Sequence, residues 1–337
     1  LMSSIRGHFA LDSSRASEPD LGAGAVRHAE SGCIVTADAT IYYRDQLAAT
    51  LGMADSAPDD HQLILAAYLR WGESCAEHLE GDFAFAIFDP REQKLFCARD
   101  RYAVRPFYYH FAQGKTFVFA LDARDVLQFP DVPFAINEGR VADFLVPELQ
   151  WIDYTSTFYE GVLRLPPAHC LSVTASGLRI AEYWTPRPGP ELGLSSDDEY
   201  CEAFLDIFSR AVQERASVPS GEVGSMLSGG MDSGSIVAIA RDSVHPYSLA
   251  RRRGAECPES QRIYATLDHL GLRGTQIIAD DEASLPDDTL ADLAEPFDGE
   301  FAFLKAIYAA AKQDGIDVVL DGAAGDVVFN EGAYITR

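Results

Sequence analysis

The sequence predicts a two-domain chain of mixed α and β structure, with a β-sandwich domain at residues 1–190 and a parallel α/β domain at residues 197–337. Short apolar runs separated by turn residues fill the first half, which favours stacked antiparallel sheets. In the second half such runs alternate with helical periodicity, which favours a parallel sheet with helices on both faces. A Pro/Gly/Ser-rich stretch at residues 185–196 (TPRPGPELGLSS) separates the two halves.

Each half supplies its elements in chain order. The first half predicts strands at residues 82–88, 94–98, 106–110 and 116–120, and amphipathic helices at 61–71 and 137–145. Ser196 and Glu199 have the spacing of a capping box, which predicts a helix that ends near residue 216. Its apolar positions fall on one face: Phe204, Ile207, Phe208, Ala211 and Val212. The second half predicts strands at residues 223–227, 247–250, 276–279 and 316–320, and helices at 233–240, 258–270 and 300–313.

Composition excludes several classes of protein. The net charge is −25, from 52 acidic and 27 basic residues, so we expect no nucleic-acid partner. No apolar run approaches the roughly 20 residues of a membrane span, and residues 1–7 lack the layout of a secretion signal. The six cysteines form no C-x-x-C pair, which favours reduced, buried thiols and a cytoplasmic location. Arg251–Arg253 is either a solvated loop or a local grip on phosphate or a carboxylate.

A phosphate-binding loop is predicted at residues 228–233 (SGGMDS), between a strand and a helix. Glycines let backbone N–H groups approach an anion, and the helix N-terminus adds unpaired donors. Ser228 and Ser233 can donate hydrogen bonds to phosphate oxygens, whereas Asp232 suits Mg²⁺ better. The loop lacks the Gly-Lys-Ser/Thr ending of a Walker A loop and resembles the SGGxDS loop of ATP pyrophosphatases. The alternative is a Gly/Ser turn with no ligand.

A second acidic loop, residues 321–326 (DGAAGD), follows the strand at 316–320. In a parallel sheet it can face the first loop, so that Asp326 adds a second carboxylate for Mg²⁺. The alternative is a solvated turn. Glu259 is a further candidate ligand, or only a helix cap. The residues predicted to bind ATP are Leu227, Ser228, Gly229, Gly230, Asp232, Ser233 and Gly322, with Asp232 and Asp326 as metal ligands.

Three segments of the first half resemble motifs of the asparagine synthetase family. Residues 81–89 (GDFAFAIFD) resemble its G-x-FAFA-x-x-D strand, and residues 98–109 (ARDRYAVRPFYY) resemble ARDRFG-x-KPLYY. Residues 165–169 (LPPAH) resemble its LPPGH turn. The resemblance covers most of the chain and implies an N-terminal Ntn-hydrolase-like αββα sandwich followed by an ATP-pyrophosphatase-type synthetase domain. It also implies a further helical region after the second loop, so no catalytic residue is named.

The first half departs from that family at its glutamine site. The family begins Met-Cys-Gly-Ile, and the cysteine attacks glutamine, whereas residues 2–5 read MSSI here. Ser3 thus replaces the nucleophile, and a serine hydroxyl needs a base to act. The family's glutamine-gripping N-G-E stretch appears as DAT at residues 38–40. We therefore expect residues 1–190 to form an inactive glutamine-amidotransferase-like domain with a structural role.

The second half carries Ala323 where asparagine synthetases have a glutamate. Two related enzyme groups, the β-lactam synthetases and the lasso-peptide cyclases, also lack the nucleophile, and the pattern at residues 321–332 resembles the lasso cyclases. The resemblance implies a lasso-peptide macrolactam synthetase that uses ATP and Mg²⁺, with a precursor peptide and its maturation protease as partners. A β-lactam synthetase, an ammonia-dependent asparagine synthetase and a non-catalytic ATP-binding partner protein are the alternatives. The acidic surface and the missing C-x-x-C pair argue against a tRNA-modifying pyrophosphatase.

Overall fold

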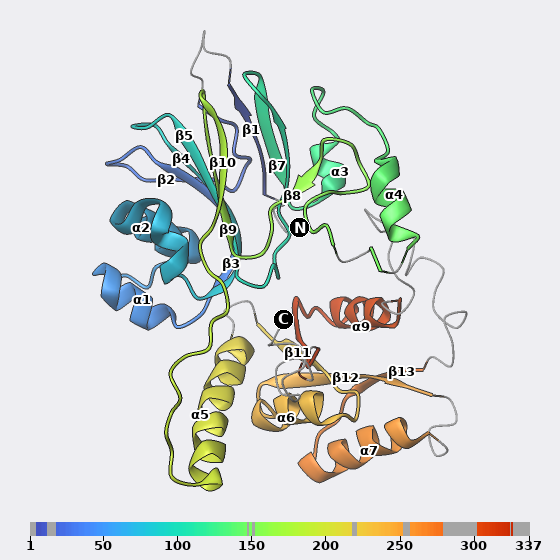
Figure 1. Cartoon of the computed structure of the whole chain (residues 1–337). Helices are drawn as coiled ribbons and strands as arrows, with labels where there is room; N and C mark the ends of the chain where they lie inside the picture. Colours follow the sequence, from blue (N-terminus) through green and yellow to red (C-terminus); the bar gives the residue numbers. More distant parts are fainter. Residues whose placement is uncertain are drawn as a thin grey trace. The chain divides into compact units, whose positions relative to one another are not determined.

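The structure is a computed structural model of the chain that describes residues 5–11, 18–146, 148–149, 152–217, 221–251, 257–278, 302–323 and 325 (Figure 1). The chain divides into two compact units, unit 1 at Leu1–Gly189 and unit 2 at Pro190–Arg337. Within the described ranges, no helix combines the length and the apolar character that a membrane crossing requires.

Unit 1 contains two antiparallel sheets. Its strands are β1 (Arg6–Ala10), β2 (Val26–Arg27), β3 (Ile34–Ile41), β4 (Gly81–Asp89), β5 (Lys94–Arg99), β6 (Tyr108–Ala112), β7 (Thr116–Ala120), β8 (Leu163–Arg164), β9 (His169–Thr174) and β10 (Gly177–Glu182). One sheet has the order β1-β7-β6-β8 and the other β10-β9-β5-β4-β3-β2. The predicted antiparallel sheets are confirmed.

Helices of unit 1 cover the outer faces of the two sheets, except for α4, which stands apart from them (Figure 1). They are α1 (Arg44–Leu51), α2 (Asp60–Trp71), the 3₁₀ helix η1 (Gly72–His78), α3 (Ala123–Val126) and α4 (Glu138–Phe144). Buried side chains of α2 pack on Phe85 and Phe96 of the six-stranded sheet, and α3 packs on Val118 of the other sheet. A third cluster, which includes Phe88 and Phe119, fills the space between the sheets. Unit 1 is therefore the αββα sandwich that the family resemblance implied.

Local sequence explains where several elements begin. Asp59 caps α2, since its carboxylate accepts from the backbone N–H of Gln62 at 2.8 Å while the Gln62 side chain accepts from the Asp59 N–H. Asn137 caps α4 as predicted, with its side-chain oxygen accepting from Arg140 N. The strand predicted at residues 106–110 starts later, at Tyr108. Pro106 has no N–H to donate to a neighbouring strand.

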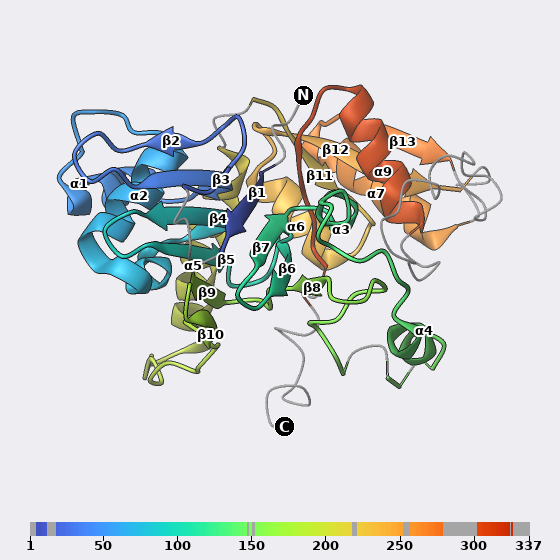
Figure 2. The ribbon, with the colours of Figure 1, turned by 90° about the horizontal axis from the view of Figure 1, so that it is seen from above.

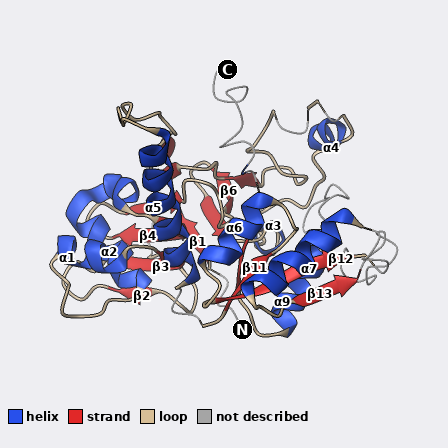
Figure 3. Cartoon of the chain, turned by 90° about the horizontal axis from the view of Figure 1, so that it is seen from below, coloured by secondary structure: helices blue, strands red, loops and turns tan. Residues whose placement is uncertain are grey.

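Unit 2 is a parallel α/β domain. Its elements are α5 (Asp197–Ala216), β11 (Val223–Met226), α6 (Met231–Ile239), β12 (Val244–Ala250), α7 (Pro258–Leu270), β13 (Thr275–Ile278), α9 (Ala302–Gln313) and β14 (Val318–Leu320). The four strands pair in parallel in the order β13-β12-β11-β14. Figures 2 and 3, taken from opposite sides, show α9 on one face of this sheet and α6 and α7 on the other. The predicted parallel sheet with helices on both faces is confirmed.

Helix α5 differs from its prediction in two details. Ser196 Oγ accepts from Glu199 N, but the Glu199 carboxylate accepts from Ser195 N, so the reciprocal half of the capping box was predicted wrongly. Phe208 packs beside the buried Val212 in a cluster that includes residues of α6, whereas Phe204 and Ile207 are exposed. The predicted apolar stripe is thus only partly buried.

Four of the cysteines are free and buried, as predicted: Cys33, Cys75, Cys97 and Cys170. Burial raises the pKa of Cys75 and Cys97, which keeps both thiols protonated. Cys201 is exposed and Cys257 is partly exposed, so the prediction of burial was wrong for these two.

Ser225 of β11 gives a first testable prediction. Its hydroxyl is fully buried and has no hydrogen-bond partner among the described residues. Because an unmade buried hydrogen bond is unfavourable, Ser225→Ala should raise the free energy of unfolding by about 1 kcal/mol. Ser260 is equally buried but accepts from Arg251 N, so Ser260→Ala should lower that free energy. Urea unfolding of both variants checks the prediction, which fails if both substitutions shift stability in the same direction.

Candidate functional site

The predicted phosphate loop connects β11 to α6 and is held by its own two serines. Ser228 Oγ and Ser233 Oγ are 3.0 Å apart, and Ser228 N donates to Ser233 Oγ at 3.1 Å. Ser228 Oγ also accepts from Gly230 N at 3.3 Å. Ser233 is buried, whereas Ser228 and Gly230 are exposed. The buried Ser233 hydroxyl therefore supports the loop from inside, whereas the Ser228 hydroxyl lies at the surface of the loop.

The start of α6 offers free donors. Gly230 is its N-cap and provides no side-chain cap. The backbone N–H groups of Met231, Asp232 and Ser233 find no acceptor in the part of the chain that the structure describes. Such groups, together with the partial positive charge of a helix N-terminus, favour an anion. The arrangement therefore suits a phosphate, in keeping with the sequence prediction.

Helix α7 packs closely against the phosphate loop at Gly229. Gly229 has φ +77°, and a Cβ there would lie 2.8 Å from the Glu259 carbonyl oxygen and 2.9 Å from Arg262 Cβ. Only glycine satisfies both the backbone angle and the close approach. Leu227 anchors the end of the strand in a buried cluster with Ile263 of α7. Leu227 therefore holds the loop in place through the core.

The second acidic loop lies against the first. Strand β14 pairs with β11 in parallel, so both loops leave the same edge of the sheet. A Cβ on Gly322 would lie 2.8 Å from Ser233 N, and a Cβ on Gly325 would lie 2.4 Å from Asp232 Oδ2. The structure thus brings together Gly322, Gly325 and Asp232. Asp326 lies outside the described residues, so its role as a metal ligand stays a prediction.

The remaining predicted residues take simpler positions. Asp321 is exposed, and its Oδ1 accepts from Ala323 N at 3.0 Å. Glu259 is exposed in the first turn of α7, where an acidic side chain is favourable, and its role as a metal ligand stays a prediction. Arg251 is exposed after β12, and the other two arginines of that run lie outside the described residues.

The donors present fit ATP and Mg²⁺. No cluster of three His, Cys, Asp or Glu side chains suited to a metal occurs within the described ranges. Mg²⁺ typically takes only one or two carboxylates and completes its shell with water and substrate phosphates. Asp232 is half-buried at the tight contact between the two loops. It could hold the metal beside a phosphate bound at the start of α6.

Cys257 is a feature of this region that the sequence did not single out. It is the N-cap of α7, and hydrogen bonds from the backbone and side chain of Ser260, with the nearby Arg251, lower the pKa of its thiol. At neutral pH a larger fraction is therefore thiolate. Iodoacetamide at pH 7 should alkylate Cys257 faster than the exposed Cys201, as measured by peptide mass spectrometry. Equal rates would contradict the prediction.

In unit 1, residues 38–40 are the stretch that resembles the family's glutamine-binding N-G-E segment. Residues 38–40 lie in β3, and Arg105 reaches them, with Nε 3.6 Å from Asp38 Oδ1 and Nη2 3.3 Å from Thr40 Oγ1. Ser3 lies outside the described residues. A cavity of about 840 Å³ opens beside β1 and is lined by Asp20, His61 and other residues of unit 1. The expectation that unit 1 does not hydrolyse glutamine stays a prediction.

Family comparisons agree with the two folds. Residues 7–184 match the model of a glutamine amidotransferase domain, and residues 203–336 match the model of asparagine synthase. Unit 1 thus matches an amidotransferase domain, and unit 2 is a parallel domain in which two loops meet at Asp232. Together they define the class of protein that joins an amidotransferase domain to a synthetase domain. The chain belongs to the asparagine synthetase family.

Three curated relatives illustrate the similarity. Asparagine synthetase [glutamine-hydrolyzing] 3 of Bacillus subtilis is 32% identical over 198 residues, which are 56% of this chain and 31% of that protein. Amidase chry2 of Gibberella zeae is 28% identical over 324 residues, 87% of this chain and 45% of that protein. Putative asparagine synthetase [glutamine-hydrolyzing] 2 of Methanocaldococcus jannaschii is 25% identical over 313 residues, which are 90% of this chain and 59% of that protein. The chain therefore spans between 31% and 59% of the length of these relatives.

Proposed function

We propose that this chain is part of an ATP-dependent amide-bond-forming ligase that activates a carboxylate as an acyl-adenylate. The observation that carries the proposal is the close packing of Gly322 and Gly325 against Asp232 and Ser233, at the edge where β11 and β14 end. In open α/β sheets, ligands bind outside the carboxyl ends of the strands, where these two loops meet. The free N–H groups of α6 supply the anion contacts.

The residues act on the leaving group. The N–H groups at the start of α6, with the Ser228 hydroxyl, would hold the β- and γ-phosphates, and Asp232 and Asp326 would hold Mg²⁺. When bound, the metal neutralises charge that develops on the departing pyrophosphate. A substrate carboxylate oxygen attacks the α-phosphorus as the bond to pyrophosphate breaks. An amine nitrogen then attacks the acyl carbon, AMP leaves with the bonding electrons, and the amine loses a proton.

The finer proposal is a macrolactam synthetase of the lasso-peptide type. Its precursor peptide supplies both the side-chain carboxylate and the N-terminal amine, so the ring closes with loss of one water. Ala323 stands where asparagine synthetases have a glutamate, and Ser3 stands where they have the cysteine nucleophile. A peptide amine makes free ammonia unnecessary, which agrees with a decayed glutamine site. The maturation protease of the peptide is the expected second partner, in the cytoplasm.

Aspartate amidation is the second candidate, favoured by the relatives named asparagine synthetase. In that case ammonia replaces the peptide amine, and the product is an amide without a ring. The same adenylation site serves both reactions.

Product mass separates these functions. The full-length protein would be given MgATP with aspartate plus ammonia, with a β-amino acid that carries a second carboxylate, or with leaderless lasso precursor peptides. A peptide lighter by one water, with AMP and pyrophosphate released, supports the macrolactam synthetase. Asparagine formation supports the second candidate, and a cyclised β-amino acid supports a β-lactam synthetase. ATP binding without pyrophosphate release on any substrate indicates a non-catalytic partner protein and overturns the proposal.

Asp232 provides the internal control for that assay. Asp232→Asn keeps the side-chain size and removes the charge that suits Mg²⁺, so it should abolish AMP release. Asp242→Asn removes an exposed carboxylate three residues after the end of α6 and should leave AMP release unchanged. Loss of activity in both variants would show that the assay does not report on the site.

A further inference from the structure

An exposed apolar surface follows α4 in unit 1. Figures 1 and 2 show this helix standing apart from the two sheets of the unit. Leu145 is 73% exposed and Ile152 is 70% exposed, and Val146, Leu149 and Tyr154 are exposed as well. We call these five side chains the α4 face. Scattered exposed apolar residues are ordinary, whereas five within ten residues of chain are a concentration of the kind that interaction surfaces show.

The α4 face is kept compact by its backbone. Val146 N donates to Asp143 O at 3.2 Å, Leu149 N to Val146 O at 2.9 Å, and Ile152 N to Leu149 O at 3.2 Å. These successive turns bring side chains that are three residues apart onto a short stretch of surface.

The inner side of α4 is anchored to unit 1. Phe144 packs edge-on against Phe158 at 5.4 Å between ring centroids, and Arg140 lies over the same ring. Asn137 Nδ2 donates to Thr157 O at 3.1 Å. The segment that carries the α4 face therefore follows a helix that is itself anchored to unit 1.

The chain segment that carries the α4 face is acidic, although Arg164, outside that segment, donates to Ser156 O at 2.9 Å. Residues 131–160 contain six carboxylates and one basic side chain, Arg140, which is buried. Glu148 lies between Val146 and Leu149 in the chain and is exposed. Asp153 accepts from Thr155 N at 2.7 Å and Ser156 N at 3.1 Å, and although burial alone raises its pKa, hydrogen bonds from Ser156 and Thr155 lower that pKa well below its usual range. The face thus combines apolar side chains with fixed negative charge.

We propose that the α4 face binds a polypeptide segment that carries both basic and apolar side chains. Apolar anchors supply binding energy and the flanking carboxylates select a basic partner. A second copy of this chain would meet the same negative charge and is disfavoured. An anionic membrane is disfavoured for the same reason. The inference is independent of the reaction that the ATP site performs.

A pair of defined peptides tests the proposal on the whole chain. The probe is a fluorescent 18-residue amphipathic helix of leucine and lysine, compared with a leucine and glutamate version, and binding is followed by fluorescence anisotropy. The lysine peptide should bind, and Leu145→Ser with Ile152→Ser should weaken its affinity at least about tenfold. Both side chains are largely exposed, so circular dichroism should show an unchanged fold.

Matched variants separate the α4 face from the general acidity of the chain. Ile180→Ser with Leu192→Ser removes exposed apolar groups elsewhere, and should change affinity less than about twofold. Glu138→Lys with Glu148→Lys should weaken binding, whereas Glu30→Lys with Glu77→Lys, also exposed in unit 1, should not.

Several results would overturn the proposal. Equal binding of the glutamate peptide, or equal effects of the control pairs, would show that the α4 face is not selective. Binding to phosphatidylcholine vesicles that is lost with Leu145→Ser and Ile152→Ser would identify a membrane instead. Self-association of the chain that the same pair abolishes, measured by sedimentation, would identify a second copy.

Discussion

Gly325→Ala is expected to reduce ATP–pyrophosphate exchange at least about 100-fold, because its added Cβ would displace the Asp232 carboxylate. That Cβ would lie 2.4 Å from Asp232 Oδ2 and 2.5 Å from Cγ, far inside van der Waals contact. Asp232 lies in the first turn of α6 next to the free N–H donors, so a shift of its carboxylate would misplace the proposed metal relative to the phosphates. Displacements of about 1 Å at a reacting centre cost factors of this size. The exchange would be measured with a substrate from the panel described above.

Gly234→Ala is the matched control for this prediction. Gly234 lies in α6 two residues after Asp232, and a Cβ there would meet nothing within 4 Å. Alanine is preferred over glycine inside a helix, so the control should be about 1 kcal/mol more stable and fully active. MgATP binding, measured by calorimetry, should weaken in Gly325→Ala and not in Gly234→Ala. Undiminished exchange in Gly325→Ala would show that Asp232 need not hold its observed position.

The phosphate loop could be predicted from sequence because its signal is local. A short apolar strand, two glycines, a serine pair and an apolar helix follow one another within residues 223–239, and the structure places them in that order. The contact that makes Gly229 indispensable comes from α7, about thirty residues further along the chain. No local pattern reports such tertiary contacts. The same holds for the approach of Gly325 to Asp232.

Several strands of unit 1 were not predicted, and β3 shows why. Its sequence, IVTADATI, alternates apolar and polar residues from Val35 to Ile41, but two of the apolar positions are alanines, and alanine and aspartate are uncommon in strands, so the strand signal is weak. Asp38 is accommodated by Arg105, a partner that lies 67 residues later in the chain. No local sequence pattern shows that Asp38 has a partner so far along the chain.

Two alanines mark further departures that only the backbone reveals. Ala103 and Ala168 both have φ +57°, a left-handed conformation that glycine adopts more readily. They stand where the resembled ARDRFG and LPPGH motifs have glycine. The Asp100 carboxylate accepts from the N–H groups of Tyr102, Val104 and Arg105, which holds the first of these turns closed. At these two turns the fold therefore holds alanine in a backbone conformation that glycine adopts more readily.

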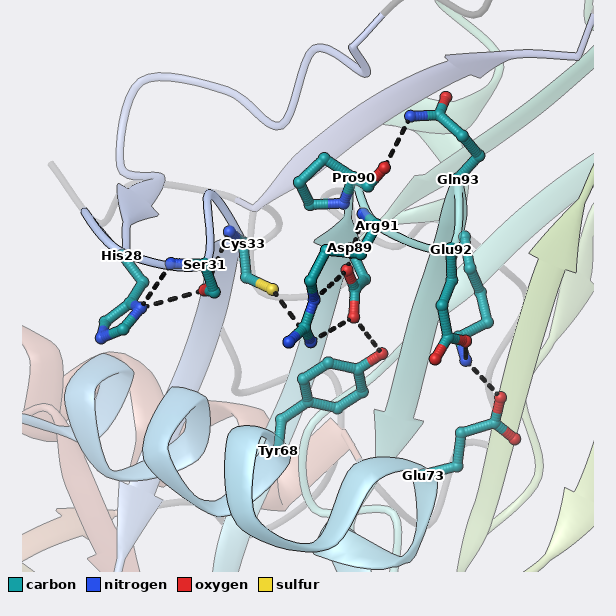
Figure 4. A network of polar contacts seen from close by, with 11 residues as sticks. His28, Ser31, Cys33, Tyr68, Glu73, Asp89, Pro90, Arg91, Glu92 and Gln93 are labelled. Carbon is teal, nitrogen blue, oxygen red and sulfur yellow. Dashed lines mark hydrogen bonds and ion pairs between the residues drawn. The ribbon is translucent and has the colours of Figure 1, made fainter.

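The polar network at the end of β4 leads to the second prediction of large effect (Figure 4). Asp89 is only 1% exposed, and its carboxylate accepts from Arg91 N at 2.9 Å, Arg91 Nε at 2.9 Å and Arg91 Nη2 at 2.7 Å. Tyr68 of α2 donates to the same carboxylate at 3.4 Å. Arg91 Nη2 also lies 3.8 Å from the sulfur of the buried Cys33. One carboxylate therefore joins the β4–β5 turn to α2.

Asp89→Asn should lower the free energy of unfolding by about 2 kcal/mol at pH 7, since it removes the charge from a buried, hydrogen-bonded group. Hydrogen bonds from Arg91 outweigh the effect of burial and lower the pKa of Asp89 in the folded state. The unfolded pKa is about 3.9, so the ionised form adds stability that is complete above that pH and is lost as pH falls through the lower folded pKa. The difference between the wild-type protein and the variant should therefore be constant from pH 7 to 5 and shrink below about pH 4.

Asp122→Asn is the control that separates the effect of burial on stability from the effect of the hydrogen bonds to arginine. Asp122 and Arg124 repeat the Asp-x-Arg geometry, with Arg124 N, Nε and Nη2 all donating to the carboxylate, but the Asp122 side chain is 30% exposed. Ion pairs that water can reach contribute less than about 1 kcal/mol, so Asp122→Asn should cost less than Asp89→Asn. Urea unfolding at pH 7, 5 and 3.5 makes the comparison. Equal losses in the two variants, or a loss in Asp89→Asn that does not change with pH, would show that the buried carboxylate is not what ties the turn to α2.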